Sequence, residues 1–319
     1  MKQVASRDDR AYRYTTAIVA AAIVLLVLGI GFELTRQSTL AIQKFGFGFW
    51  KGRVWDPVSG EFGALPFIWG TLYSSILALL IATPVSLGIA VFINEVSPRF
   101  LRQPLTYLTE LLAAIPSIVY GLWGVFVLIP IVRKLEMLRP EWLKNSPFLS
   151  GPPLGVGMGA AALILAVMVI PFSSAVAREI LKGVPMNQRE AAYALGATRW
   201  EAIRVALGYG RVGIIGAVML GFGRALGETM AVTMVIGNNP QLSASLAAPQ
   251  YTMAAVIANE FTEAADELYL HALIEIGLVL FVITIIINAL SRFLIWSMSQ
   301  RAVAPAPRPV VATNEAAVV

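Results

Sequence analysis

The sequence contains no cysteine and a single histidine, His271, among its 319 residues. Disulfides, thiolate metal sites and cysteine nucleophiles are therefore excluded, as is a metal centre built from several histidines. Charged residues are also scarce, at 13% of the chain, whereas soluble domains carry roughly 25%. With 57% hydrophobic residues and a mean hydropathy of +0.73, the chain cannot cover its apolar surface in water, and we expect it to be embedded in a lipid bilayer.

Several functional classes lack their sequence signals. The GxxxxGK[ST] loop that cradles ATP phosphates is absent, so we expect no ATP hydrolysis by this chain alone. The net charge of +5 comes from bases spread over several loops, which gives no argument for nucleic acid binding. We therefore predict no catalytic residues, no metal and no cofactor in this chain, and no segment has the character of a soluble catalytic domain.

Six apolar segments are long enough to cross a bilayer, which takes about 20 residues. We predict an all-α, polytopic membrane protein with transmembrane helices over 14–32, 67–93, 105–132, 156–176, 212–236 and 272–298. The first segment is too long for the apolar region of a signal peptide and has no small-residue cleavage site, so we expect it to be retained. Together these segments form a transmembrane domain over 14–298.

The distribution of Lys and Arg predicts the orientation of these helices, because cytoplasmic segments carry an excess of positive charge. If the N-terminus is cytoplasmic, fifteen of the 24 bases fall in inside segments, and the outer segment 237–269 contains none. Both termini are therefore predicted to be cytoplasmic. We expect short tails over 1–13 and 299–319, and the proline-containing second tail is predicted to be disordered.

The most specific local pattern lies in the predicted cytoplasmic loop at about 178–211. Glu190, Ala191 and Ala192 are followed by Gly196, which fits the left-handed position that ends a helix. Thr198 then precedes Glu201 by three residues, as in a capping box. We predict two short helices joined by a tight glycine turn, with apolar anchors at Tyr193, Leu195 and Trp200. From helix propensity alone, an ordinary amphipathic loop is an equally good interpretation.

This loop resembles the "EAA" loop of the permease subunits of ABC importers, in which Glu-Ala-Ala is followed four residues later by Gly. In that family the loop forms a coupling helix that fits a groove on a separate ATPase subunit. The resemblance implies this coupling role for Glu190, Ala191, Ala192, Gly196, Thr198 and Trp200. The family pattern continues to an Ile-x-Leu-Pro ending, whereas this chain reads Val-Ala-Leu-Gly at 205–208. The missing proline leaves open how the second helix ends.

Two further segments resemble the phosphate-type permeases of this family, and the similarity is closest to their C-type subunits. They are residues 110–124, which correspond to the third helix, and 223–233, which correspond to the fifth. The resemblance implies a MetI-like permease fold in a bacterial inner membrane and import of inorganic phosphate. It also implies four kinds of partner: a homologous A-type permease in a heterodimer, two ATPase subunits that bind ATP and Mg²⁺, an external phosphate-binding protein and the lipid bilayer.

Arg224 and Glu228 are charged residues inside the predicted fifth helix. On a continuous helix they share a face, because they are four residues apart. Charges at membrane depth usually face protein or water, and the planar fork of Arg suits an oxyanion. We therefore predict a substrate pathway that includes Arg224, Glu228, Thr229 and Ser117. A structural ion pair that fixes helix packing is the alternative.

Three more residues stand out within the apolar segments. Glu110 is expected near the inner end of the third helix, and Glu275 near the outer end of the sixth, beside His271. Either carboxylate could pair with Arg224 or lie at the membrane interface. Pro116 is expected to kink the third helix and to free a carbonyl group.

Other functions stay open at this point. The chain could be a permease for sulfate or molybdate, or an A-type phosphate permease. A membrane-embedded hydrolase is disfavoured, because a lone histidine and no cysteine leave few nucleophile and base pairs. A channel that works alone would need no ATPase subunit, so copurification of an ATPase distinguishes it from an importer.

Overall fold

The computed structural model describes residues 7–144 and 146–302. Its elements, in chain order, are α1 (Arg7–Gln37), α2 (Thr39–Phe45), α3 (Gly48–Lys51), β1 (Trp55–Asp56), β2 (Glu61–Phe62), α4 (Leu65–Val91), the π-helical turn η1 (Phe92–Val96), α5 (Arg99–Ala114), α6 (Ser117–Trp123), the π-helical turn η2 (Gly124–Leu128), α7 (Ile129–Met137), α8 (Glu141–Lys144), α9 (Met158–Lys182), α10 (Met186–Ala194), α11 (Arg199–Leu226), α12 (Met230–Val235), α13 (Met253–Glu260) and α14 (Glu267–Ala302). Within these residues, six helices are long and apolar enough to cross a membrane.

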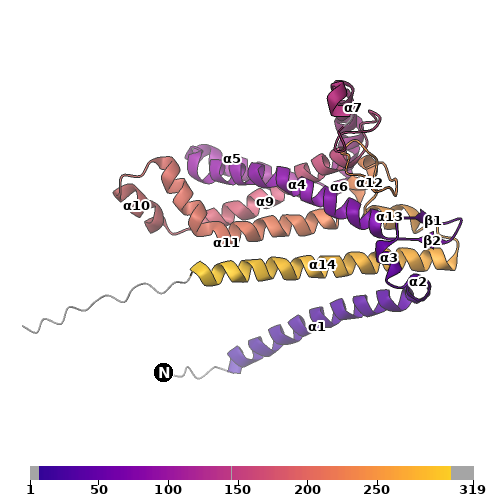
Figure 1. Cartoon of the computed structure of the whole chain (residues 1–319). Helices are drawn as coiled ribbons and strands as arrows, with labels where there is room; N and C mark the ends of the chain where they lie inside the picture. The colour runs from indigo at the N-terminus through magenta and orange to yellow at the C-terminus, as the bar shows by residue number, and fades with distance from the viewer. Residues whose placement is uncertain (1–6, 145, 303–319) are drawn as a thin grey trace, which may run out of the picture.

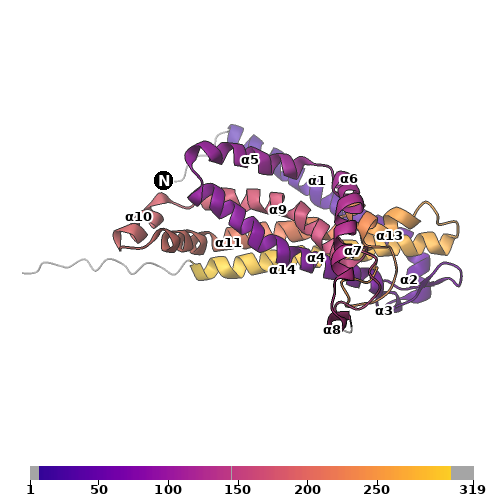
Figure 2. The same ribbon diagram turned by 90° about the horizontal axis from the view of Figure 1, so that it is seen from above.

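The axes of the long helices α1, α4, α9, α11 and α14 are roughly aligned, with some helices running up and others down the bundle (Figure 1). Helix α10 projects from one end of this bundle, and the β1–β2 hairpin and α13 lie at the other end, as Figure 2 also shows. We call these the α10 end and the hairpin end. Helix α1 begins and α14 finishes at the α10 end.

Helix α9 forms the centre of the bundle and packs against α4 and α11. Its first turns carry small residues, including Ala160, Ala161 and Ala162, all of which are buried. Small side chains let neighbouring helix backbones approach closely, which is how membrane helices gain packing energy without a hydrophobic driving force. Larger buried side chains, among them Ile164 and Leu165, complete this core.

The hairpin end is held by an aromatic cluster. Trp55 of β1 pairs with Phe62 of β2 in the antiparallel ladder, and Phe62 stacks on Tyr269 of α14. The carboxylate of Glu260 accepts hydrogen bonds from Trp55 Nε1 at 2.8 Å and from the Tyr269 hydroxyl at 2.6 Å. One acidic side chain therefore ties the hairpin, α13 and α14 together.

Four of the six predicted helices are confirmed, with displaced ends. Segments 14–32, 67–93, 156–176 and 272–298 correspond to α1, to α4 with η1, to α9 and to α14. The predicted N-terminal tail 1–13 overlaps α1, which begins at Arg7. The predicted disordered tail lies outside the described residues from 303 onward.

The continuous third helix over 105–132 is wrong. Helix α5 ends at Ala114, and Ile115 and Pro116 are extended, with ψ of 129° and 141°. A proline disfavours the helical conformation of the residue before it and removes a hydrogen-bond donor, which favours a break at this point. Pro84, Pro104 and Pro171 lie inside continuous helices, so proline alone does not decide between a kink and a break. The segment α6–η2–α7 then leaves in a new direction (Figure 1).

The continuous fifth helix over 212–236 is also wrong. Helix α11 ends at Leu226, residues 227–229 are not helical, and α12 begins at Met230. Gly227 is a weak helix former because it loses the most backbone freedom on folding. Conversely, the second short helix predicted after Thr198 is in fact the start of the 28-residue α11.

Candidate functional site

Two broken helices meet in the bundle, where α12 packs against α6. Their close approach depends on Gly121. A Cβ atom at this position would lie 2.5 Å from Met234 Sδ and 3.1 Å from Ala231 Cα. Backbone that is not helical is tolerated at membrane depth only where protein or a water-filled cavity surrounds it. The breaks at 115–116 and 227–229 therefore mark this region as a candidate functional site.

Arg224 lies in the last turn of α11, beside these breaks, and its side chain is exposed. The guanidinium lies over the ring of Phe172 from α9, at 5.8 Å from the ring centroid. Within the described residues it forms no hydrogen bond or ion pair. The Tyr120 hydroxyl of α6 donates to the Leu112 carbonyl at 2.7 Å, across the first break.

The predicted Arg224–Glu228 pair does not form in the described structure. Because the helix stops between the two residues, they lose the spacing that would place them on one face. Glu228 Oε1 instead accepts from the Ala231 amide at 3.3 Å, in the first turn of α12. The alternative of a structural Arg224–Glu228 ion pair is thereby wrong as well.

The two predicted hydroxyl residues are placed differently. Thr229 Oγ1 donates to the Gly227 carbonyl at 3.3 Å, within the break itself. Ser117 opens α6 directly after Pro116 and is partly exposed. Both border the broken segments, but no hydrogen bond joins either to Arg224 in the part of the chain that the structure describes.

The predicted glycine turn after α10 is confirmed. Gly196 has φ of +82°, and the Ala197 amide donates to the Ala192 carbonyl at 3.1 Å. Thr198 and Glu201 form the predicted capping box, with the Thr198 amide donating to Glu201 Oε2 at 2.7 Å. No proline follows, and residues 205–208 lie inside α11, so the helix continues into the bundle without a break.

The outer surface of this element is exposed and partly apolar. Tyr193, Leu195 and Trp200 are 48%, 90% and 56% exposed, and Glu190 and Ala191 are exposed beside them. In α10 only Ala192 is buried. Exposed large apolar side chains grouped on a projecting helix indicate a contact surface for a partner.

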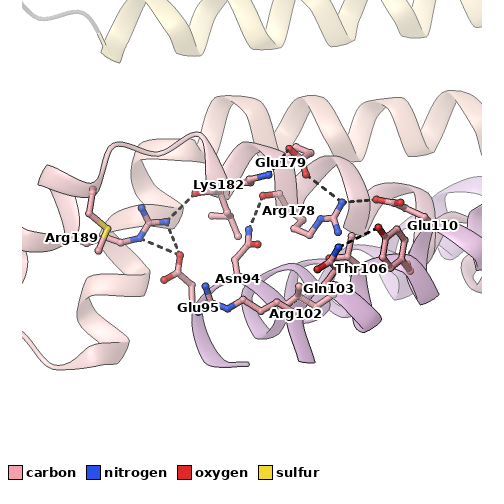
Figure 3. A pocket seen from close by; sticks show the side chains of 14 residues that line it. Asn94, Glu95, Arg102, Gln103, Thr106, Glu110, Arg178, Glu179, Lys182 and Arg189 are labelled. Atoms are coloured by element: carbon pink, nitrogen blue, oxygen red, sulfur yellow. Dashed lines mark hydrogen bonds and ion pairs between the residues drawn. The ribbon is translucent and has the colours of Figure 1, made fainter. Parts of the chain in front are cut away.

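A polar crevice of about 630 Å³ lies between η1, α5, α9 and the start of α10 (Figure 3). Arg178 of α9, whose side chain is only 8% exposed, donates to Glu110 of α5 at 3.0 Å and forms an ion pair with Glu179 at 3.3 Å. Glu110 therefore pairs with Arg178 and not with Arg224, near the α10 end. Arg189 of α10 forms a second ion pair across the crevice, with Glu95 of η1.

Glu275 lies in α14 and is buried, with 2% of its surface exposed. One of its carboxylate oxygens and His271 Nδ1 have no hydrogen-bond partner among the described residues. Glu275 therefore does not pair with Arg224 either.

Comparison with known proteins places this arrangement in a family. Residues 86–301 match the family described as the binding-protein-dependent transport system inner membrane component. A phosphate transport system permease protein PstC from Mesorhizobium japonicum is 44% identical, over 92% of this chain and 91% of that protein. The chain belongs to this family of permeases. A PstC from Haemophilus influenzae is 45% identical, over 91% of this chain and 93% of that protein. A probable PstC from Methanocaldococcus jannaschii is 36% identical, over 92% of this chain and 95% of that protein.

Solved structures agree on the fold. The inward-facing MetNI methionine ABC transporter matches with a TM-score of 0.54 and 18% identity, over 75% of this chain and 94% of its own. A bacterial ABC transporter involved in import of the acidic polysaccharide alginate matches with a TM-score of 0.56 and 17% identity, over 90% and 97%. The permease is thus a multi-pass protein of the inner membrane with the ABC importer fold.

Sequence reasoning missed the residues that hold the crevice of this permease together. Glu95 and Arg189 are 94 positions apart, and no local pattern connects them. Arg178 and Arg189 entered the prediction only as positive charges that set orientation. Phe172 carried no signal, because an aromatic residue in an apolar helix is ordinary core until its neighbour is known.

Proposed function

We propose that this chain is a permease subunit of an ATP-driven importer that carries inorganic phosphate into the cytoplasm. The observation that carries the proposal is the match along almost the whole chain to proteins named as phosphate transport system permeases. The exposed α10 element and the broken helices beside an unpaired Arg support it. The chain itself has a transport role and no enzymatic one.

The proposed orientation places the α10 end in the cytoplasm and the hairpin end outside. The excess of Lys and Arg in the segments assigned to the inside supports it. The start of α1 and the end of α14 lie at the α10 end (Figure 1), which agrees with both termini being cytoplasmic. An ATPase in the cytoplasm could then reach α10.

The partners follow from this orientation. Two ATPase subunits bind ATP and Mg²⁺, and one of them receives α10 and the turn at Gly196. A homologous A-type permease completes the membrane part, and an external binding protein delivers phosphate at the hairpin end. Helix α5, which buries none of its residues within this chain, leaves an apolar face free for the second permease or for lipid.

In the proposed pathway, Arg224 is the residue that attracts the anion. Its position over the Phe172 ring places the aromatic contact on one side of the guanidinium and leaves its N–H groups free to donate to an oxyanion. Glu228 and Thr229 fix the non-helical segment beside it, and Ser117 borders the facing break. A pathway must also release its ion, and one unpaired cation binds more weakly than a closed ring of donors.

The test is ATP-dependent uptake by the complete complex reconstituted in liposomes. Labelled phosphate is the substrate, and unlabelled phosphate, sulfate or molybdate is added as competitor. We expect uptake to require ATP and the binding protein, and only unlabelled phosphate to compete. Inhibition by sulfate or molybdate at lower concentrations than unlabelled phosphate would assign the permease to another oxyanion, and ATP-independent conduction would assign a channel.

A further inference from the structure

The side chain of Arg189 reaches back from α10 to the bundle. Arg189 donates to Glu95 Oε1 through Nη2 at 2.6 Å and through Nε at 3.2 Å. The same guanidinium donates to the main-chain carbonyls of Val184 and Leu181, both at 2.9 Å. The Arg189 and Glu95 side chains are only 12% and 16% exposed. Figure 3 shows this ion pair crossing the crevice.

A second arginine binds the same residue from the other side of the glycine turn. Arg199, the first residue of α11, donates to the main-chain carbonyl of Glu95 and to that of Val96. Hydrogen bonds from Arg189 of α10 and from Arg199 of α11 therefore converge on Glu95. Charge-assisted hydrogen bonds of this kind are stronger than neutral ones, and the planar guanidinium fixes their geometry.

Glu95 belongs to η1, the π-helical turn that ends α4. The Ser97 amide donates to the Phe92 carbonyl at 2.7 Å, which closes the wider turn. Asn94 of the same turn donates to the Arg178 carbonyl at 2.7 Å and links η1 to α9. Single π-turns are rare and occur frequently at functional sites. From η1, α4 runs to the hairpin end of the bundle, where it meets α13.

We propose that Glu95 is a positioning residue that passes the displacement of α10 to α4. The proposal rests on the proposed coupling of α10 to an ATPase. The covalent connections alone would carry this motion into α9 and α11. Because α10 buries little of its own surface, the Arg189–Glu95 pair supplies its side-chain connection to η1, and α4 then moves with α10 as well.

The test compares Glu95→Gln with the wild-type chain in the complete reconstituted complex. Uptake and ATP hydrolysis are measured on the same liposomes, and their ratio is the readout. The matched control is Glu179→Gln, the same substitution in the same crevice, at a carboxylate whose side chain is 59% exposed and lies outside this connection. We expect Glu95→Gln to bind the ATPase and hydrolyse ATP but to lower the uptake-to-hydrolysis ratio about fivefold or more, since coupling free energies commonly correspond to about 5- to 150-fold. An unchanged ratio would overturn the proposal.

Two additional variants separate coupling from folding. Arg189→Lys keeps the charge but lacks the planar fork that bonds the carboxylate and two carbonyls at once. We therefore expect this variant to lower the uptake-to-hydrolysis ratio as well. The double variant Glu95→Gln with Arg189→Lys should be no worse than the poorer of these two single variants, because the two residues act as one connection. Additive losses, or a reduced yield of complex with a normal ratio, would assign the pair a purely structural role. Failure of the wild-type complex to import phosphate would instead refute the proposed function.

Discussion

At the scale of single residues, an unpaired cation in an apolar bundle has to be explained. The charge of Arg224 would be costly in hydrocarbon, by about 2.5–3.5 kcal/mol on insertion scales, yet no acidic side chain neutralises it within the described structure. Phe172 supplies a cation–π contact, and the edge of the guanidinium remains free. Such a residue suits a transient anion better than a permanent structural bond.

Replacing Arg224 should therefore reduce transport without preventing assembly. We expect Arg224→Gln to lower phosphate uptake at least about tenfold, which corresponds to about 1.4 kcal/mol. Arg224→Lys should also lower phosphate uptake, because an ammonium group lacks the planar fork of a guanidinium. Uptake by reconstituted complex and the yield of assembled complex are both measured. The control is Arg292→Gln on the exposed side of α14.

Normal uptake by an assembled Arg224→Gln complex would contradict the pathway role. Loss of assembly with no transport measurable would favour packing as the role of Arg224. Phe172→Leu keeps an apolar contact but removes the ring quadrupole, and we expect an intermediate loss of uptake.

Gly121 offers a test of how closely the two broken helices pack. Gly121→Val should destabilise the permease by about 1–3 kcal/mol through overpacking, because Met234 and the backbone of Ala231 leave no room for a side chain. The thermal unfolding midpoint in detergent is the measurement. Gly88→Val in α4 is the matched control, since a Cβ atom there meets nothing within 4 Å. Equal midpoints for the two variants would show that α12 and α6 are not tightly packed.

At the scale of elements, the permease combines long continuous helices with breaks at 115–116 and 227–229. Helix α11 connects the exposed turn at Gly196 to the break at Gly227 as one uninterrupted rod. Because the capping box satisfies its first amides, the rod begins at a defined residue. A movement at the turn can therefore reach Arg224, at the far end of the same helix.

Removal of the cap should loosen the start of this rod. Thr198→Ala should cost about 0.5–2 kcal/mol of helix stability, and Thr198→Ser should retain most of it because the hydroxyl remains. Hydrogen exchange of the amides at 199–202 measures the effect. We expect roughly fivefold or faster exchange in the alanine variant, as about 1 kcal/mol implies. Unchanged exchange would mean that packing, and not the cap, fixes this end.

At the scale of the whole molecule, the permease is incomplete by itself. Along the most apolar stretch of α1 no residue is buried, and α5 buries none of its residues. Tyr193 of α10, Leu195 of the turn after it and Trp200 at the start of α11 are exposed. Lipid can cover the first two surfaces. The third projects from the end of the bundle, where exposed apolar side chains indicate a contact surface for a protein partner.

Changing this surface should remove the ATPase from the purified complex. We expect Glu190→Lys and Gly196→Arg each to reduce copurification of the ATPase subunit by about tenfold or more, a loss of at least about 1.4 kcal/mol. Gly196→Arg acts partly through the backbone, because φ of +82° disfavours any side chain. Lys51→Glu, an exposed residue at the hairpin end, is the control. Undiminished copurification would exclude α10 as the docking element.

The sequence by itself determined the membrane environment, four of the helices and the turn at Gly196 with its capping box. These depend on apolar length and on contacts between residues a few positions apart, which a linear pattern records. It could not determine that Pro116 and Gly227 end helices, because a proline or glycine in an apolar run is compatible with either a kink or a break. Only the tertiary structure decided that choice, through the packing of α12 on α6. It also decided the pairing of Arg189 with Glu95 and of Arg178 with Glu110, because such contacts depend on how distant helices pack.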